Sequence, residues 1–125
     1  MQTLAEPIRL RILNCLAAAP LFVSDLQEVL QLPQSTVSRH LQVLRRAALV
    51  RDTPVTPYVM YRLRPPAGAS GRLLRSVLDV LTTVEPMKGE RRRAHERSRS
   101  DYFDRVRGEP AGTPAETPPT VEEPS

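Results

Sequence analysis

Short hydrogen-bonding side chains are concentrated in the stretch QSTVSRHLQ, which begins at Gln34. Amide and guanidinium groups can pair with the edges of adenine and guanine in the major groove, and hydroxyl groups bond either bases or phosphates. Arg39 is therefore expected to pair with guanine, and Gln34 or Gln42 with adenine. Ser35 or Ser38 is expected to bond a base or a phosphate. On the pattern alone, an ordinary solvated helix face is the alternative.

Helical periodicity places these polar groups opposite an apolar stripe. In a helix from Gln34 to about Ala48, the residues Val37, Leu41 and Leu44 lie along one side. The polar face carries Ser35, Ser38, Arg39, Gln42, Arg45 and Arg46. A helix that lies in the major groove points its N-terminal residues at base edges, so this face predicts DNA reading.

The segments around this helix follow the order of a winged helix-turn-helix. The predicted elements are helices at 7–18, 25–31 and 34–48, followed by strands at 49–53 and 58–63 that form a hairpin. Ser24 is expected to cap the second helix, with Gln27 completing a capping box. Pro33 breaks the chain between the second and third helices. The sequence thus predicts a mainly α fold with a small β-hairpin.

The body of the chain is basic, whereas its end is acidic. Of the 18 basic residues 17 are arginine, and the formal net charge is +4. Residues 109–125 hold four glutamates and no basic residue, which leaves 18 basic and 10 acidic residues in 1–108, a net charge of +8. Arginines that neutralise phosphates release counterions, so a basic body suits a polyanionic partner. Charge alone does not distinguish nucleic-acid-binding proteins from other basic proteins.

The chain resembles the ArsR/SmtB-type bacterial repressors in four segments that keep the family's order and spacing: LAEPIRLRIL, FVSDLQEVL, QSTVSRHLQVLRRAALV and VMYRL. The resemblance implies a homodimeric regulator that binds a palindromic operator in double-stranded DNA and is released by a metal or another signal. It adds Thr36 and His40 to the DNA-reading positions, although His40 lies off the polar face and could pack inside instead. The candidate DNA-binding residues are Gln34, Ser35, Thr36, Ser38, Arg39, His40, Gln42, Arg45, Arg46 and Arg51.

The metal-sensing pattern of that family is incomplete in this chain. Metal-sensing members carry two cysteines as CVCDL, where this chain has FVSDL with Phe22 and Ser24 in those places. Phenylalanine ligates no metal, and a serine hydroxyl is a poor ligand for soft ions. The single cysteine, Cys15, is expected to pack in the core. The pair His95-Glu96 reads as solvated surface, so no metal and no cofactor are predicted, and the inducing ligand stays unknown.

A further apolar helix is predicted from about Arg72 to Glu85, with an apolar arc wide enough for two partners. One part is expected to cover the domain and the rest to meet a second copy, which gives a two-fold dimer suited to a palindromic site. Burial within one chain is the alternative. The expected dimer contacts are Leu74, Val77, Leu78, Leu81 and Val84.

The chain is accordingly divided into three regions. Residues 1–64 are expected to form the winged helix-turn-helix DNA-binding domain, and 65–107 a linker with the C-terminal dimerisation and tail helices. A polar helix with internal ion pairs is expected at 90–106, where Tyr102 and Phe103 form a small apolar patch. Residues 108–125 are predicted to be a disordered, acidic, Pro-rich tail.

Other classes of function receive less support from the sequence. It shows no Ser/His/Asp or Cys/His set and no phosphate-cradling glycine loop, so an enzyme is not predicted. It has no apolar run long enough to span a membrane and no secretory signal, so a cytoplasmic location is expected. Two alternatives stay open: a DNA-binding module that senses nothing, and a winged helix that binds a protein partner.

Overall fold

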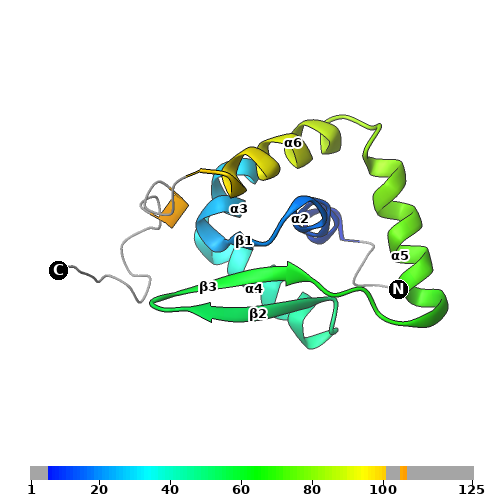
Figure 1. Ribbon diagram of the computed structural model, residues 1–125, viewed down its shortest axis with the longest axis horizontal. Coiled ribbons are helices and arrows are strands. Elements are labelled where there is room, and N and C mark those ends of the chain that lie inside the picture. Colours follow the sequence, from blue (N-terminus) through cyan, green and yellow to red (C-terminus); the bar gives the residue numbers. More distant parts are fainter. Residues whose placement is uncertain (1–5, 101–104, 107–125) are drawn as a thin grey trace.

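The computed structural model describes residues 6–100 and 105–106, and Figure 1 shows how their helices and strands are arranged. The elements are α2 (Pro7–Ala18), β1 (Leu21–Phe22), α3 (Val23–Leu30), α4 (Gln34–Arg46), β2 (Val50–Val55), β3 (Tyr58–Leu63), α5 (Gly68–Leu81) and α6 (Met87–Ser98). Their order confirms the predicted mainly α fold with a β-hairpin, a winged helix-turn-helix. The predictions for Tyr102, Phe103 and residues 108–125 lie outside the described residues.

The sheet has three antiparallel strands in the order β1-β3-β2. Strands β2 and β3 form the predicted hairpin, in which Val50 lies opposite Leu63. Strand β1 was not predicted, because two residues are too few for a periodic signal; its Leu21 pairs with Tyr61. Since β1 leads directly into α3, it joins the hairpin to the helix-turn-helix.

The hydrophobic core lies where α2, α3, α4 and the sheet meet, and α2 runs through the middle of the molecule (Figure 1). Its fully buried side chains include Ile12, Leu13, Cys15, Leu21, Leu26, Val37, Leu41 and Leu44. The expectation that Cys15 packs in the core is thus confirmed. Burial raises the pKa of the Cys15 thiol to about 12, so it stays protonated near neutral pH.

Helix α5 begins earlier than the sequence predicted, at Gly68 instead of Arg72. The reason lies at Gly71, where a Cβ would come within 1.7 Å of the carbonyl oxygen of Pro66. Only glycine allows the preceding chain to fold this closely against the first turn of the helix. The segment that was expected to be a linker therefore contributes the start of α5.

Helix α4 ends at Arg46, two residues before the predicted end at Ala48. Ala48 has a φ of 62°, in the left-handed region that ends helices. The Leu49 backbone N–H then donates to the Leu44 carbonyl oxygen at 3.0 Å. This turn directs the chain out of α4 and into β2.

Helix α6 packs on α2 and α3, and its polar groups form ion pairs with those helices instead of within α6 as the sequence suggested. The Arg11 Nη2 on α2 donates to Glu90 Oε2 on α6 at 2.6 Å, and the Glu90 side chain is nearly fully buried. Arg91 Nε donates to Asn14 Oδ1 at 3.1 Å, while Asn14 Nδ2 donates to the Met87 carbonyl oxygen at 2.9 Å. These contacts attach the first half of α6 to α2.

A second ionic cluster attaches the end of α6 and Arg105 to α3. It is centred on Asp25, whose side chain is fully buried. Arg97 Nε donates to Asp25 Oδ1 at 3.1 Å, and Arg105 Nη2 donates to Asp25 Oδ2 at 2.8 Å. The Arg105 guanidinium also lies 5.0 Å from the centroid of the Phe22 ring. One buried carboxylate thus holds two arginines at the beginning of α3.

Helix α3 begins two residues earlier than predicted, and the Asp25 carboxylate bonds the backbone at this start. The helix begins at Val23, and Asp25 Oδ2 accepts a hydrogen bond from the Phe22 backbone N–H at 2.8 Å. Ser24, which was predicted to be the cap, lies inside the helix and donates its hydroxyl to the Arg105 carbonyl oxygen. The prediction of a Ser24 cap was wrong, because the long-range contact to Arg105 was not visible in the local pattern.

Candidate nucleic-acid interface

The helix-turn-helix is formed by α3 and α4, which are joined by a short turn. Gln31 ends α3 in the left-handed conformation, with a φ of 57° and its N–H bonded to the Gln27 carbonyl oxygen at 2.9 Å. Pro33 precedes α4, and its carbonyl oxygen accepts from the Val37 N–H at 3.1 Å. The turn therefore fixes the direction in which α4 leaves α3.

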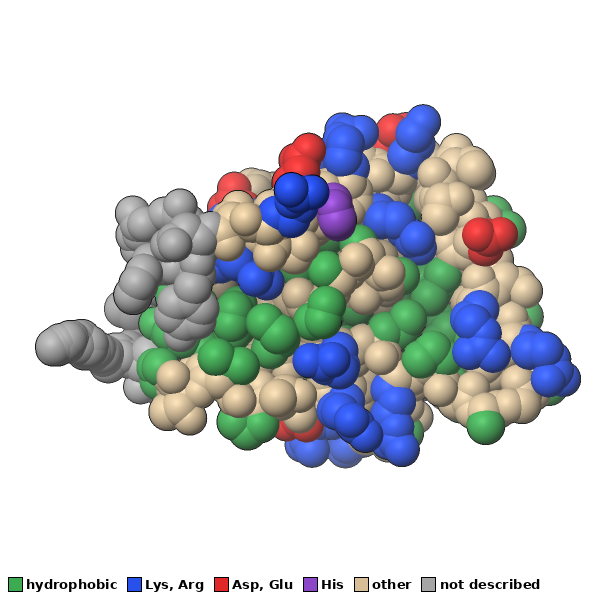
Figure 2. Space-filling model, viewed as in Figure 1, with side chains coloured by type: hydrophobic (Ala, Val, Ile, Leu, Met, Phe, Trp, Pro, Cys, Tyr) green, Lys and Arg blue, Asp and Glu red, His purple; other side chains and the backbone are tan. Residues whose placement is uncertain are grey.

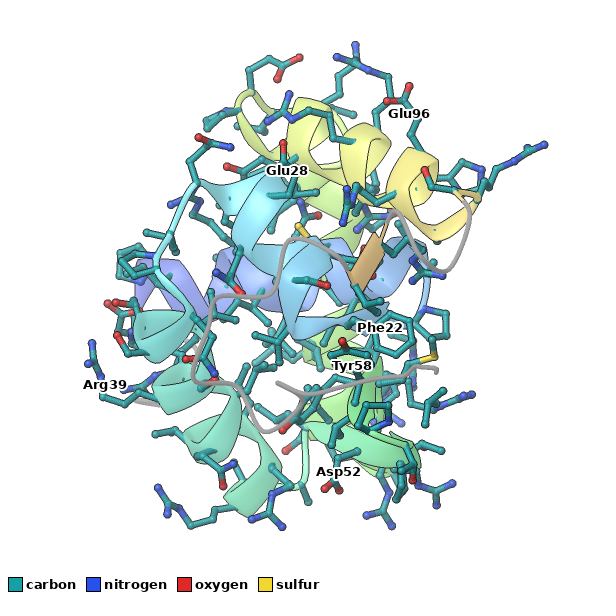
Figure 3. The ribbon with its side chains drawn as sticks, turned by 90° about the vertical axis from the view of Figure 1, so that its left-hand side faces the viewer. Phe22, Glu28, Arg39, Asp52, Tyr58 and Glu96 are labelled. Atoms are coloured by element: carbon teal, nitrogen blue, oxygen red, sulfur yellow. The ribbon has the colours of Figure 1, made fainter. Side chains whose placement is uncertain are left out.

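Helix α4 separates an inner apolar side from an outer polar side. Val37, Leu41 and Leu44 are fully buried and hold the helix against the core. Arg39 projects away from the helix at the edge of the molecule (Figure 3). Of the predicted contacts, Ser35, Arg39, Arg45 and Arg46 are exposed, and Gln34, Thr36, Ser38 and Gln42 are partly exposed.

Two hydrogen bonds order part of this polar side. Gln34 Nε2 donates to Ser38 Oγ at 3.0 Å, and Arg45 Nη2 donates to Gln42 Oε1 at 3.0 Å. Each bond links side chains about one helical turn apart, which limits their rotamers. Arg39 has no hydrogen-bond or ion-pair partner among the residues described. Its guanidinium is thus available for an external acceptor such as a guanine edge or a phosphate.

His40 differs from the other predicted contacts because it faces inward. It is buried, with an exposed fraction of 7%, and its Nδ1 accepts from Arg9 Nε at 3.2 Å. Burial lowers the pKa of His40, and the nearby Arg9 and Arg39 lower it further, while Glu6 opposes the shift. The neutral imidazole accepts a hydrogen bond from Arg9 on α2, which holds α4 in place, and it is turned away from the polar side.

The hairpin contributes two neighbouring arginines to the candidate interface. Arg51 on β2, a predicted contact, lies directly opposite Arg62 on β3, and both are exposed. Figure 2 shows basic side chains gathered near the base of the hairpin. Like charges at opposed positions of a sheet are destabilising, so a bound phosphate would relieve this pair. Arg62 was not among the predicted contacts, since its position opposite Arg51 depends on the register of the hairpin.

At the two positions where metal-sensing relatives carry cysteines, this chain has the buried residues Phe22 and Ser24. Phe22 is buried beneath Arg105, and Ser24 is buried with its hydroxyl bonded to the Arg105 carbonyl oxygen. Cys15 bears a thiol whose raised pKa disfavours the thiolate that binds metals. Within 6–100 and 105–106, no group of three or more His, Cys, Asp or Glu side chains could hold a metal ion.

Helix α5 divides the predicted dimer contacts between two sides. Leu74 and Leu78 are buried, and Leu81 is partly buried against the same core. Val77 is partly exposed, and Val84 follows the helix with an exposed fraction of 43%. The outer side also presents Leu73 and Val80, which are 54% and 61% exposed and were not among the predicted contacts. The helix stands at one end of the molecule, away from the hairpin tip (Figure 1).

Comparison with known proteins identifies the family. A family model described as a helix-turn-helix domain matches residues 4–53. The regulator Rv2034 of Mycobacterium tuberculosis, described as an HTH-type transcriptional regulator, is 40% identical over 78 residues, which cover 62% of this chain and 70% of that protein. The chain belongs to the ArsR/SmtB-type helix-turn-helix transcriptional regulators.

Two further relatives show how far the similarity extends. The HTH-type transcriptional regulator NmtR of Mycobacterium tuberculosis is 43% identical over 63 residues, half of this chain and 52% of that protein. The biofilm growth-associated repressor of Agrobacterium fabrum is 32% identical over 85 residues, 68% of this chain and 71% of that protein. Membership of this family makes the chain a DNA-binding transcriptional regulator. No helix in the described part is long and apolar enough to cross a membrane.

Proposed function

We propose that this regulator binds a palindromic operator as a homodimer and represses transcription, with α4 as the recognition helix. The observation that supports this most directly is the division of α4. Its apolar residues Val37, Leu41 and Leu44 are fully buried, and the polar side opposite them, which includes Ser35 and Arg39, faces outward. A helix of this kind is held by its domain and offers its hydrogen-bonding groups to a groove.

The proposed contacts fall into base-reading and phosphate-binding groups. Arg39 lies in the second turn of α4 and would pair with a guanine, while Gln34, Ser35, Thr36, Ser38 and Gln42 would bond neighbouring bases or phosphates. Arg45 and Arg46 lie at the C-terminal end of α4 and would bind the phosphate backbone. Arg51, together with Arg62, would contact phosphates beside the recognition helix.

The proposed dimer surface is the outer side of α5. It consists of Leu73, Val77, Val80 and the following Val84, because Leu74, Leu78 and Leu81 are used within the chain. Apolar side chains exposed on one side of a helix are stabilised when a second copy covers them. A two-fold axis through this surface would present two recognition helices to half-sites about one turn of DNA apart.

We further propose that this member of the family does not respond to soft metals through the usual cysteine pair. Phe22 and Ser24 provide no thiolate, and the Cys15 thiol is buried. Arsenite, cadmium or lead should therefore leave DNA affinity unchanged. A stoichiometric loss of DNA binding on addition of one of these ions would contradict this part of the proposal and implicate Cys15.

In-vitro selection of duplexes from a random library tests the main proposal. The expected result is an inverted repeat bound by two chains, with affinity that falls steeply as salt is raised. Selection of a duplex bound by a single chain would argue against the dimer. A failure to bind any duplex, even at low salt, would instead support a winged helix that binds a protein partner.

A further inference from the structure

A cavity of about 360 Å³ opens between α3 and α6. Glu28 and Val29 line it from α3, and Arg93, Glu96 and Arg97 line it from α6. No residue of α4 contributes to its wall. Glu28 and Glu96 lie at the opposite end of the molecule from Asp52 on the hairpin (Figure 3). The volume is at the small end of the range of about 300–1,000 Å³ that is usual for ligand sites.

The cavity carries both signs of charge, and its carboxylates form no ion pair with its guanidinium groups. Among the described residues, Glu28, Arg93 and Glu96 have no ion-pair partner, although carboxylates and a guanidinium line the same space. Val29 supplies a buried apolar patch in the wall. A small ligand that carries an anionic and a cationic group would satisfy both signs, whereas a singly charged ligand would leave one sign unused.

Arg97 connects this cavity to the helix-turn-helix. It lines the cavity, and its Nε donates to the buried Asp25 Oδ1 at 3.1 Å. Asp25 in turn accepts from the Phe22 N–H, at the junction between β1 and α3. A ligand that competes for the Arg97 guanidinium would thus weaken a contact that holds α3.

We infer that this cavity binds a zwitterion of amino-acid or dipeptide size. Its carboxylate would lie at Arg93 and Arg97 and its ammonium group at Glu28 and Glu96, with the apolar part against Val29. This inference deepens the proposed function by naming the chemical class of the effector. Its effect on DNA rests on that function, but binding of the ligand itself does not.

The bound zwitterion lowers operator affinity, because the ligand carboxylate competes with Asp25 for the charge of the Arg97 guanidinium. Coupling between two sites on one protein is typically about 5–150-fold, and it is reciprocal. The ligand should therefore weaken operator binding by about fivefold or more. Bound operator should weaken ligand binding by the same factor.

Calorimetric titration of the full chain with the twenty amino acids and a set of glycyl dipeptides tests the binding step. At least one of these zwitterions should bind with a dissociation constant in or below the millimolar range. Its N-acetyl form and its carboxamide form, which each lack one charge, should both bind at least tenfold more weakly. Arg93→Gln and Glu28→Gln should each weaken binding at least tenfold, whereas Arg92→Gln, beside the cavity-lining Arg93, should not.

The outcomes separate this inference from the proposed function. If no compound of the panel binds, or if Arg93→Gln binds as tightly as the original chain, the zwitterion site is overturned. If the N-acetyl form binds equally well, the cavity is an anion site and the inference is again overturned. Operator binding by the ligand-free chain is measured separately, so its failure would count against the proposed function alone.

Discussion

Helices α4 and α6 have similar length and are both rich in arginine, but they use their charges in opposite ways. They contain 13 and 12 residues, with three arginines in α4 and four in α6. The arginines of α4 face outward, and Arg39 has no partner in the described part of the chain. In α6, by contrast, Arg91 and Arg97 bond groups on α2, α3 and α5, and Glu90 is paired with Arg11.

The difference follows from the apolar residues of each helix. Helix α4 has an apolar stripe whose burial holds it to the core, so its polar groups are not needed for packing. Helix α6 has little apolar surface to bury, with Ala94 its main core residue, so ion pairs and hydrogen bonds hold it in place. The number of basic residues therefore does not locate a nucleic-acid surface. The proposed surface on α4 is distinguished instead by the buried apolar stripe on the opposite side of the helix, which leaves its polar side facing outward.

The largest expected effect comes from removing the buried Asp25 carboxylate, which pairs with arginines of the C-terminal part. Asp25→Ala would leave the buried Arg105 and the partly buried Arg97 without their carboxylate and remove the acceptor of the Phe22 N–H. Loss of one partner of a buried ion pair costs about 3–5 kcal/mol, so the free energy of unfolding should fall by that amount. Urea denaturation measures it. Glu28→Ala, an exposed carboxylate on the same helix, is the matched control and should change stability by less than about 0.5 kcal/mol.

A smaller effect is expected at α5, which buries one apolar side in the core, as α4 does, and exposes a second apolar side. Val80→Glu places a charge on the exposed side, and the dimer should weaken at least 100-fold, or by about 2.7 kcal/mol. Sedimentation measures the dissociation constant. Unfolding measured at concentrations where the original chain is monomeric should show little change, because Val80 is 61% exposed in the single chain. Arg75→Glu, elsewhere on the exposed surface of α5, is the control. An unchanged dimer in Val80→Glu would place the interface elsewhere.

The sequence predicted the fold well but the contacts between distant elements poorly. Periodicity located α2, α3, α4, the hairpin and the polar side of α4, because these signals are local. The helix predicted at 90–106 was misplaced, since α6 begins at Met87 and ends at Ser98. The pairing of Asp25 with Arg97 and Arg105, and the opposition of Arg51 and Arg62, depend on how the chain folds back. A charged helix such as α6, which the sequence suggests is solvated, can thus pack on the domain through ion pairs with residues of other helices.

The smallest expected effect concerns His40, the predicted DNA contact of α4 that is buried. Burial lowers the pKa of His40, so the unfolded chain takes up a proton at a higher pH than the folded chain. The free energy of unfolding should therefore be unaffected by this group above its ordinary pKa of about 6.5 and should decrease as pH falls below it. Urea denaturation between pH 7.5 and 5.5 should show a smaller pH dependence in His40→Gln.

The central claim, that the outward side of α4 reads bases, is tested most directly by comparing Arg39→Ala with Arg45→Ala. Affinity is measured for the selected duplex and for a scrambled duplex at several salt concentrations. Arg39→Ala should cost about 1–3 kcal/mol on the selected duplex and much less on the scrambled one. Arg45→Ala should weaken both duplexes alike and reduce the salt slope by about one. Equal losses on both duplexes for Arg39→Ala would contradict base reading by this residue.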